Sequence, residues 1–113
     1  MRLITGVLLF FCLSVVYAGA GDIEVSGLAI KVISEEYGMM SVGLKVNVYN
    51  HGSPGKLYIT VQGLDAEGFE ILSHVFDSYI GASEKKTLSD NRTFRKENFN
   101  KVIEWRIKSI EKY

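Results

Sequence analysis

The sequence is poor in the residues that carry most covalent and redox chemistry. It has one cysteine, one proline and two histidines among 113 residues. The cysteine, Cys12, lies in an apolar N-terminal stretch, so residues 21–113 contain no thiol. This excludes a thiol enzyme, a disulfide exchanger and a cysteine-ligated metal centre. A domain formed by these residues must be held together by packing instead of by disulfides.

Motifs of catalytic chemistry are also missing. The chain has no glycine-rich phosphate loop, no G-x-S-x-G and no H-E-x-x-H. His51 stands in a turn containing glycine and proline, where we expect it to be exposed. His74 stands three residues from Asp77, so the two would face opposite sides of a strand and form no dyad. We therefore expect no enzyme, no catalytic residue, no cofactor and no bound metal.

The N-terminus has the anatomy of a secretory signal peptide. Arg2 precedes an apolar run from Leu3 to Val16, and small residues follow at positions 18–20. Signal peptidase accepts small side chains at these subsites, so we expect cleavage after Ala20, with Ala18 nearly as good. The alternative is an uncleaved anchor, but the run is shorter than the ~20 residues needed to span a bilayer and lacks a basic flank.

This interpretation divides the chain into a signal peptide at residues 1–20 and one domain at residues 21–113. It predicts a periplasmic or secreted protein with no membrane span after cleavage. Residues 91–93, Asn-Arg-Thr, match the N-glycosylation acceptor pattern. Glycosylation of Asn91 has meaning only in a eukaryotic secretory pathway, and the leader does not settle the kingdom.

Charge is balanced in total and uneven along the chain. The sequence has 13 basic and 13 acidic residues, which gives no support to nucleic-acid binding. Gly21 to Glu84 contains 3 basic and 9 acidic residues, whereas Lys85 to Tyr113 contains 9 basic and 4 acidic residues. One interpretation is that antiparallel pairing sets basic strands beside acidic ones. The other is a basic patch that docks on an acidic envelope protein or an anionic envelope polymer. Its residues are Lys85, Lys86, Arg92, Arg95, Lys96 and Lys101.

Apolar residues recur at every second position in four stretches, the spacing that places them on one face of a β-strand. The stretches are residues 28–32, 42–48, 57–61 and 102–108. Turn-forming sequences separate the strands at intervals of about ten residues, which is typical of antiparallel sandwiches. We therefore predict an all-β fold, an antiparallel Ig-like or fibronectin-like β-sandwich of about seven strands. The predicted core residues are Trp105, Ile103, Ile107, Leu44, Val46, Ile59 and Val61.

The stretch GLDAEGFEIL, residues 63–72, predicts a hairpin. We expect Asp65 to accept hydrogen bonds from turn amides and Gly68 to take a left-handed conformation. Asp65, Glu67 and Glu70 could offer oxygen ligands to calcium, but their spacing does not match the twelve-residue loop of the common site.

Residues 69–80 are apolar on both faces, so this strand is either buried on both sides or interrupted by a β-bulge. We favour a bulge near Ser73. Residues 95–102 have few strand formers and predict a single helical turn before the last strand.

The order of strands and turns resembles bacterial Ig-like or fibronectin-type envelope domains, especially the FxLYD kind. The resemblance is carried by VGLKVNVYNHG (42–52), KLYITVQGLDAEGFEI (56–71), GASEKKTLS (81–89) and IEWRIKSI (103–110). At the position of the family's F-x-L-Y-D, residues 61–65 read VQGLD and keep the aspartate. The resemblance implies an accessory, non-enzymatic module of the cell envelope and brings no catalytic residue.

Two functions remain open from the sequence. The preferred one is an exported module that binds a protein partner through a sheet face or an edge strand, whose main-chain groups already point outward. The alternative is a small-ligand or carbohydrate-binding module in which Tyr49, Tyr58 and Tyr79 stack on the ligand. Tyrosines gathered beside one pocket would favour the ligand, and scattered tyrosines would favour the partner.

Overall fold

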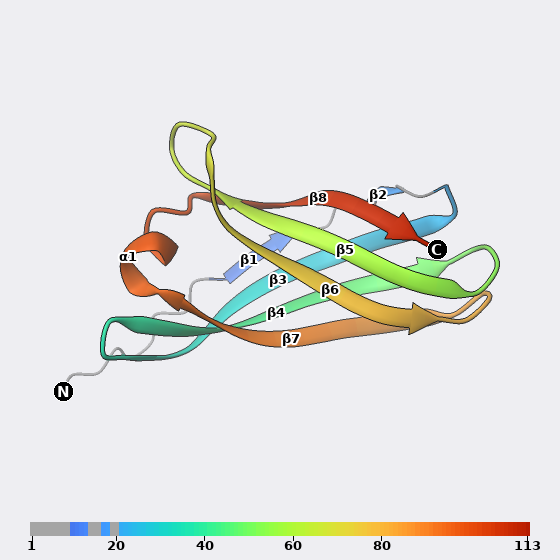
Figure 1. The fold of residues 1–113 in the computed structure, drawn as a ribbon, viewed down its shortest axis with the longest axis horizontal. Coiled ribbons are helices and arrows are strands. Elements are labelled where there is room, and N and C mark those ends of the chain that lie inside the picture. Colours follow the sequence, from blue (N-terminus) through green and yellow to red (C-terminus); the bar gives the residue numbers. More distant parts are fainter. Residues whose placement is uncertain (1–9, 14–16, 19–20) are drawn as a thin grey trace.

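The protein folds into two antiparallel β-sheets packed face to face (Figure 1). The computed structural model describes residues 10–13, 17–18 and 21–113, so the predicted signal peptide and its cleavage site fall largely outside the described residues and stay a prediction. The elements are β1 (Phe10–Leu13), β2 (Tyr17–Ala18), β3 (Ile23–Glu36), β4 (Met39–Asn50), β5 (Gly55–Leu64), β6 (Glu70–Ile80), β7 (Lys85–Arg95), α1 (Lys96–Phe99) and β8 (Glu104–Lys112).

The first sheet has the strand order β1-β3-β4-β7, with β2 also paired to β3. The second sheet has the order β6-β5-β8. Residues 21–113 thus supply six strands, and the predicted antiparallel sandwich is confirmed with six strands instead of about seven. β3 and β4 are long strands joined by a tight turn. The chain reverses there in only two residues, Tyr37 and Gly38, both with positive φ, as tight hairpins require.

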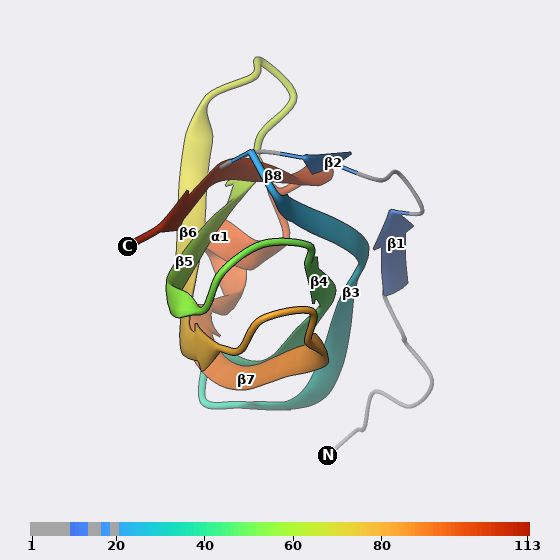
Figure 2. The same ribbon diagram turned by 90° about the vertical axis from the view of Figure 1, so that its right-hand side faces the viewer.

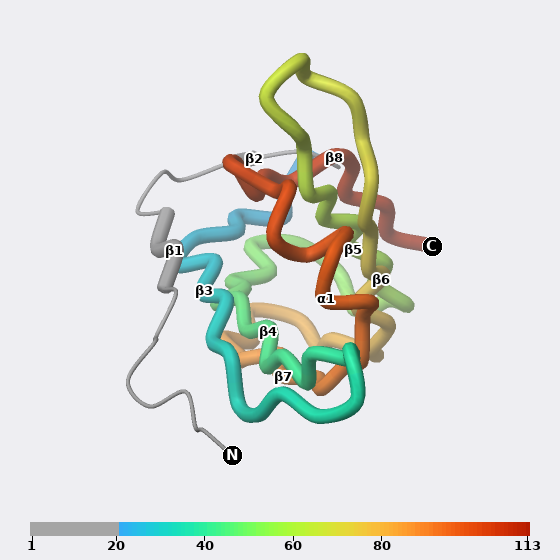
Figure 3. Tube along the Cα trace, turned by 90° about the vertical axis from the view of Figure 1, so that its left-hand side faces the viewer, coloured from blue at the N-terminus to red at the C-terminus, as the bar shows by residue number. Residues whose placement is uncertain are grey.

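The core lies between the two sheets and consists of the alternate inward residues of each strand. Leu44, Val46, Ile59, Val61 and Trp105 are buried as predicted, and each aliphatic side chain contributes about 1.5–3 kcal/mol by leaving water. At one end, α1 lies across the opening between the sheets (Figure 3). Its Phe99 packs with Phe94 and Trp105, at ring-centroid distances of 6.4 and 6.3 Å. The predicted helical turn is confirmed.

The predicted burial of Ile103 is wrong, and that of Ile107 is only partly right. Ile103 precedes β8 and is 60% exposed, while Ile107 is half-buried at the margin of the core. Ser109 pairs with Thr60 and Ile107 pairs with Val61, so Lys108 is an extra residue in β8. This bulge shifts the alternation by one residue, and it brings Ile110 into the core at 8% exposure.

The hairpin at residues 63–72 is confirmed. The Oδ1 atom of Asp65 accepts from the backbone amides of Glu67 and Phe69, both at 2.9 Å, and Gly68 has φ +86°. The predicted bulge is present in β6 at Ile71, two residues before Ser73, because Leu72 pairs with Gly63 while Glu70 pairs with Leu64. The Asp65 carboxylate thus stabilises the turn.

Candidate interaction surface

The side of β3 that faces away from β4 accepts additional strands. Phe10–Leu13 pairs antiparallel with Leu28–Lys31, and Tyr17–Ala18 pairs with Glu24–Val25. Figure 2 shows β1 lying beside β3 at the margin of the first sheet. The main-chain groups of alternate residues among 28–31 are therefore directed outward in a geometry that a further strand can use.

Two β-bulges limit the length of this edge. The pairing of β3 with β4 shifts register between Ser26 and Ala29 and again between Val32 and Ser34. Gly27, at the first shift, has φ +64°, and a Cβ there would stand 2.6 Å from Nδ2 of Asn47. Bulges twist a strand away from a straight ladder, so the regular stretch between them is only a few residues long.

Side chains alternate along this stretch. Leu28 and Ile30 are buried between the sheets, whereas Lys31 is exposed on the outer face and Ala29 is half-buried there. An added strand would therefore place alternate side chains against the core margin and against the outer face of the first sheet.

The outer face of the first sheet carries lysines without acidic partners. Lys31, Lys45 and Lys85 are exposed, and none of them forms an ion pair with a described residue. Around Gly43, which lacks a side chain, the face is hollowed into a depression of about 260 Å³. Its lining residues are Ala29, Lys31, Ile33, Gly43, Leu44, Lys45, Ser89 and Asn91.

On the outer face of the second sheet, two lysines are paired with carboxylates. Lys56 lies 3.0 Å from Asp77, and Lys108 lies 3.1 Å from Glu70. The hydrogen bonds from Lys108 and Gln62 hold the pKa of the Glu70 carboxyl below its usual value, and the Asp77 carboxylate raises the pKa of Lys56. The exposed lysines of the first sheet thus lack the acidic partners that Lys56 and Lys108 have.

The six residues of the predicted basic patch are spread along β7 and beyond it. Lys85 lies at the start of β7 on the outer face, with Nζ 4.9 Å from the centre of the Tyr49 ring. Arg95 and Lys96 lie at the other end of the strand, ten and eleven residues on, near Glu97 and Glu35 at 3.9 and 2.5 Å. Lys101 is exposed after α1.

The other two members of the patch, Lys86 and Arg92, contact β6 within the chain. Nζ of Lys86 donates to the carbonyl oxygen of Tyr79 at 2.8 Å. Nη1 of Arg92 lies 3.1 Å from Nδ1 of His74. The docking role of the whole set stays a prediction, but these two cations are engaged where the two sheets meet.

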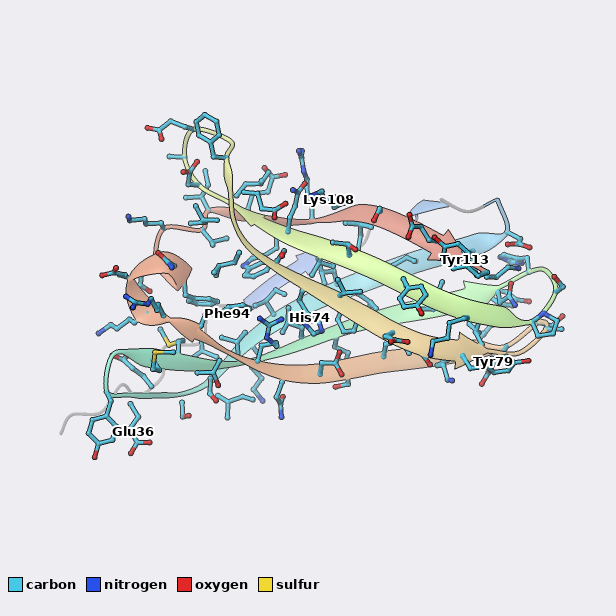
Figure 4. All side chains as sticks on the ribbon, in the orientation of Figure 1. Glu36, His74, Tyr79, Phe94, Lys108 and Tyr113 are labelled. Carbon is cyan, nitrogen blue, oxygen red and sulfur yellow. The ribbon has the colours of Figure 1, made fainter. Side chains whose placement is uncertain are left out.

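His74 is the centre of a polar bridge between the sheets that the sequence did not reveal (Figure 4). Its ring is 7% exposed, and Nε2 lies 2.7 Å from Oδ2 of Asp90. Arg92 contacts the other ring nitrogen, so the arrangement fits a neutral imidazole that donates to Asp90 and accepts from Arg92. The bridge joins β6 to β7 and leaves Asp77 paired with Lys56 instead.

The three tyrosines predicted for ligand stacking share no pocket. Tyr49 lines a depression of about 440 Å³ on the first sheet with Glu24, Lys85 and other residues. Tyr58 lies on the second sheet, 5.9 Å from Tyr113 between ring centres. Tyr79, 60% exposed, lies at the same end of the molecule as Tyr113 (Figure 4). This division favours a protein partner over a stacked ligand.

Each of the two histidines contacts one carboxylate among the described residues, His74 with Asp90 and His51 with Glu24. His51 is exposed as expected, and Nε2 lies 2.6 Å from Oε1 of Glu24. No group of three or more potential metal ligands occurs among the described residues. Within residues 10–13, 17–18 and 21–113, no helix has the length and apolar character needed to cross a bilayer.

Comparisons with known proteins identify no relative of this chain. The chain matches no protein-family model, no curated protein and no solved structure. The resemblance to FxLYD domains therefore stays a prediction.

Proposed function

We propose that this domain is a non-enzymatic interaction module that binds a protein partner by adding a strand of the partner to the outer side of β3. The observation that carries the proposal is the antiparallel pairing of Phe10–Leu13 with Leu28–Lys31. A segment of extended chain already occupies this edge, so the edge has the space and the main-chain geometry for strand addition.

Export makes the same edge available. Removal of a signal peptide after Ala20 would remove both β1 and β2 and leave β3 as the margin of the first sheet. Among the residues whose burial the structure describes, the core cluster lies between Ile23 and Ile110, in the part of the chain that remains after such a cleavage. The opposite side of the sandwich is joined by the contacts of Lys86 and His74 described above, which leaves less room there for an incoming strand.

The test uses the product of the full-length gene, exported by a secreting host. Mass spectrometry defines its N-terminus, and hydrogen–deuterium exchange follows the amides of Leu28–Lys31. We expect a product that starts near Gly21, with edge amides that become protected when an extended apolar peptide is added. The amides of Val42–Lys45 in the central strand β4 should stay protected throughout and serve as the internal control.

A matched peptide gives a sharper control. Methylating the amide nitrogens at alternate positions removes the donors on one side of the peptide strand without changing its side chains. The methylated peptide is expected to give no protection. Equal protection by both peptides, or a folded product that keeps Phe10–Leu13 paired with β3, would overturn the proposal.

The alternative function, a small-ligand or carbohydrate module, is supported by the depression beside Tyr49. The Tyr49 ring is flanked by Lys85 and by His51, and the ring centres of Tyr49 and His51 are 3.9 Å apart. Oligosaccharide titration monitored by the tyrosine ring resonances tests it. Shifts confined to Tyr49 that vanish in Tyr49→Ala would establish a ligand site, whereas Tyr58→Ala, on the other sheet, is the matched control.

A further inference from the structure

We infer that the strand recognised by β3 carries acidic residues at its outward positions, where Lys31 and Lys45 receive them. This inference rests on the proposed function and names the chemistry of the partner. It uses the outer face of the first sheet, whereas the patch predicted from the sequence was centred on β7.

The first contact joins Lys31 to the residue directly opposite it on the added strand. In the register that β1 adopts, one position of the added strand lies opposite Lys31 and the next but one lies opposite Ala29. Paired residues of adjacent antiparallel strands share a face, with Cβ atoms about 5 Å apart. A glutamate opposite Lys31 is therefore within reach of its ammonium group.

The second contact, between the added strand and Lys45, crosses the small side chain of Ala29. Ala29 pairs with Lys45 on its other side, so the three positions form one row across the sheet. The added strand and β4 are two strand spacings apart, about 10 Å. Only a methyl group separates them on this face, and extended glutamate and lysine side chains together cover that distance. Gly43, in the neighbouring row beside Lys31, leaves room for these side chains in the depression.

Charge on this face favours an acidic strand over a basic or neutral one. Neither lysine has an acidic partner among the described residues, in contrast to Lys56 and Lys108 on the second sheet. Exposed ion pairs each contribute modestly, so two of them should change the dissociation constant by about tenfold. The inward positions of the partner strand lie opposite Leu28 and Ile30 and should be apolar.

The experiment uses three blocked eight-residue peptides and the exported product of the full-length gene. All three alternate phenylalanine or leucine with a variable residue, which is glutamate, glutamine or lysine. We expect the glutamate peptide to bind about tenfold more tightly than the glutamine peptide and the lysine peptide to bind most weakly. The double variant Lys31→Glu, Lys45→Glu should invert the order. Lys101→Glu, an exposed lysine after α1, is the matched control and should leave it unchanged.

The outcomes separate this inference from the proposed function. If all three peptides bind with equal affinity, strand addition stands and the acidic preference is wrong. If none binds, the proposed function itself fails. A glutamate peptide of the same composition with its apolar residues moved out of alternation should not bind; equal binding would indicate general attraction of polyanions and overturn the inference. Circular dichroism of each variant establishes that the sheets are intact.

Discussion

Nζ of Lys112 lies 2.9 Å from Oδ2 of Asp22 and 2.9 Å from the carbonyl oxygen of Ser53. The last strand is thereby fastened to the residue just before β3 and to the loop between β4 and β5. Asn50, which is fully buried, donates from Nδ2 to the carbonyl oxygens of Ser53 and Gly81, both at 2.8 Å. One end of the sandwich is thus closed by side chains that reach between loops and sheets.

This contact predicts a loss of stability in acid. The hydrogen bond from Lys112 lowers the pKa of the Asp22 carboxyl from its usual 3.8, and Lys108 lowers that of Glu70 from 4.5. A carboxyl with a lowered folded-state pKa contributes stability above its unfolded value and loses it as pH falls through the folded value. We therefore expect the urea midpoint to decline below about pH 4.5.

The variants Asp22→Asn and Glu70→Gln should each flatten this decline, measured as the urea midpoint between pH 7 and pH 2. Glu36→Gln changes an exposed carboxylate that is in no ion pair with a described residue and is the matched control. A midpoint that falls equally steeply in Asp22→Asn and in the parent would show that Lys112 does not act through this carboxylate.

Trp105 should be the most costly single truncation in the core. Its ring is 2% exposed and packs with Phe94 and Phe99, so Trp105→Ala should lower the free energy of unfolding by about 3–5 kcal/mol. Its Nε1 has no hydrogen-bond partner among the described residues. Trp105→Phe, which removes that unsatisfied donor and keeps an aromatic ring, should therefore cost less.

Urea unfolding checks both variants, with Ile103→Ala as the control. Because Ile103 is exposed, its truncation should change stability by no more than about 0.5 kcal/mol. A loss from Ile103→Ala as large as that from Trp105→Ala would contradict the burial of the two side chains.

The fold class was predictable from the two-residue alternation, but the start of β8 after Ile103 and the bulge within it were not. Alternation placed Leu44, Val46, Ile59 and Val61 correctly because their strands run without an extra residue at those positions. In β8 the extra residue Lys108 reverses which alternate positions face the core, and no local sequence pattern predicts this bulge. A bulge depends on which partner residues the strand meets, and that information lies elsewhere in the chain.

A side chain at Gly27 should destabilise the fold. Alanine there would take a left-handed conformation, which costs about 1–2 kcal/mol, and its Cβ would also collide with Asn47. Gly38→Ala is the matched control, because Gly38 has φ +75° with nothing within 4 Å of the added Cβ. The free energies of unfolding should therefore fall more in Gly27→Ala than in Gly38→Ala. Adding Asn47→Ala to the first variant should reduce the difference, and an unchanged difference would argue against the collision.

The bridge around His74 should stabilise the junction of β6 and β7. His74→Ala leaves Asp90 and Arg92 without their shared partner and removes an edge-on contact with Phe76, at 4.8 Å between ring centres. We expect a loss of about 1–3 kcal/mol and faster amide exchange in both strands. His51→Ala, which removes an exposed imidazole, is the control and should do neither. Unchanged exchange in His74→Ala would mean that the bridge is not structural.

The candidate surface was predictable only in part. An edge strand and basic residues could be expected from the sequence. The sequence could not show that Lys86 and Arg92 contact β6 while Lys31 and Lys45 share the outer face. His74 meets Asp90 and Arg92 from 16 and 18 residues away, across two sheets. Contacts of this kind depend on how the two sheets pack, so they cannot be predicted from the spacing of neighbouring residues.

The two register breaks that enclose Ala29–Val32 also limit how long a bound strand can remain attached. The pairing with β1 spans four residues, and each main-chain hydrogen bond contributes only about 1 kcal/mol net. Association itself costs about 4 kcal/mol or more. A single contact of this size should therefore dissociate rapidly, and lasting attachment would need several copies of the domain engaged at once, so that avidity replaces affinity.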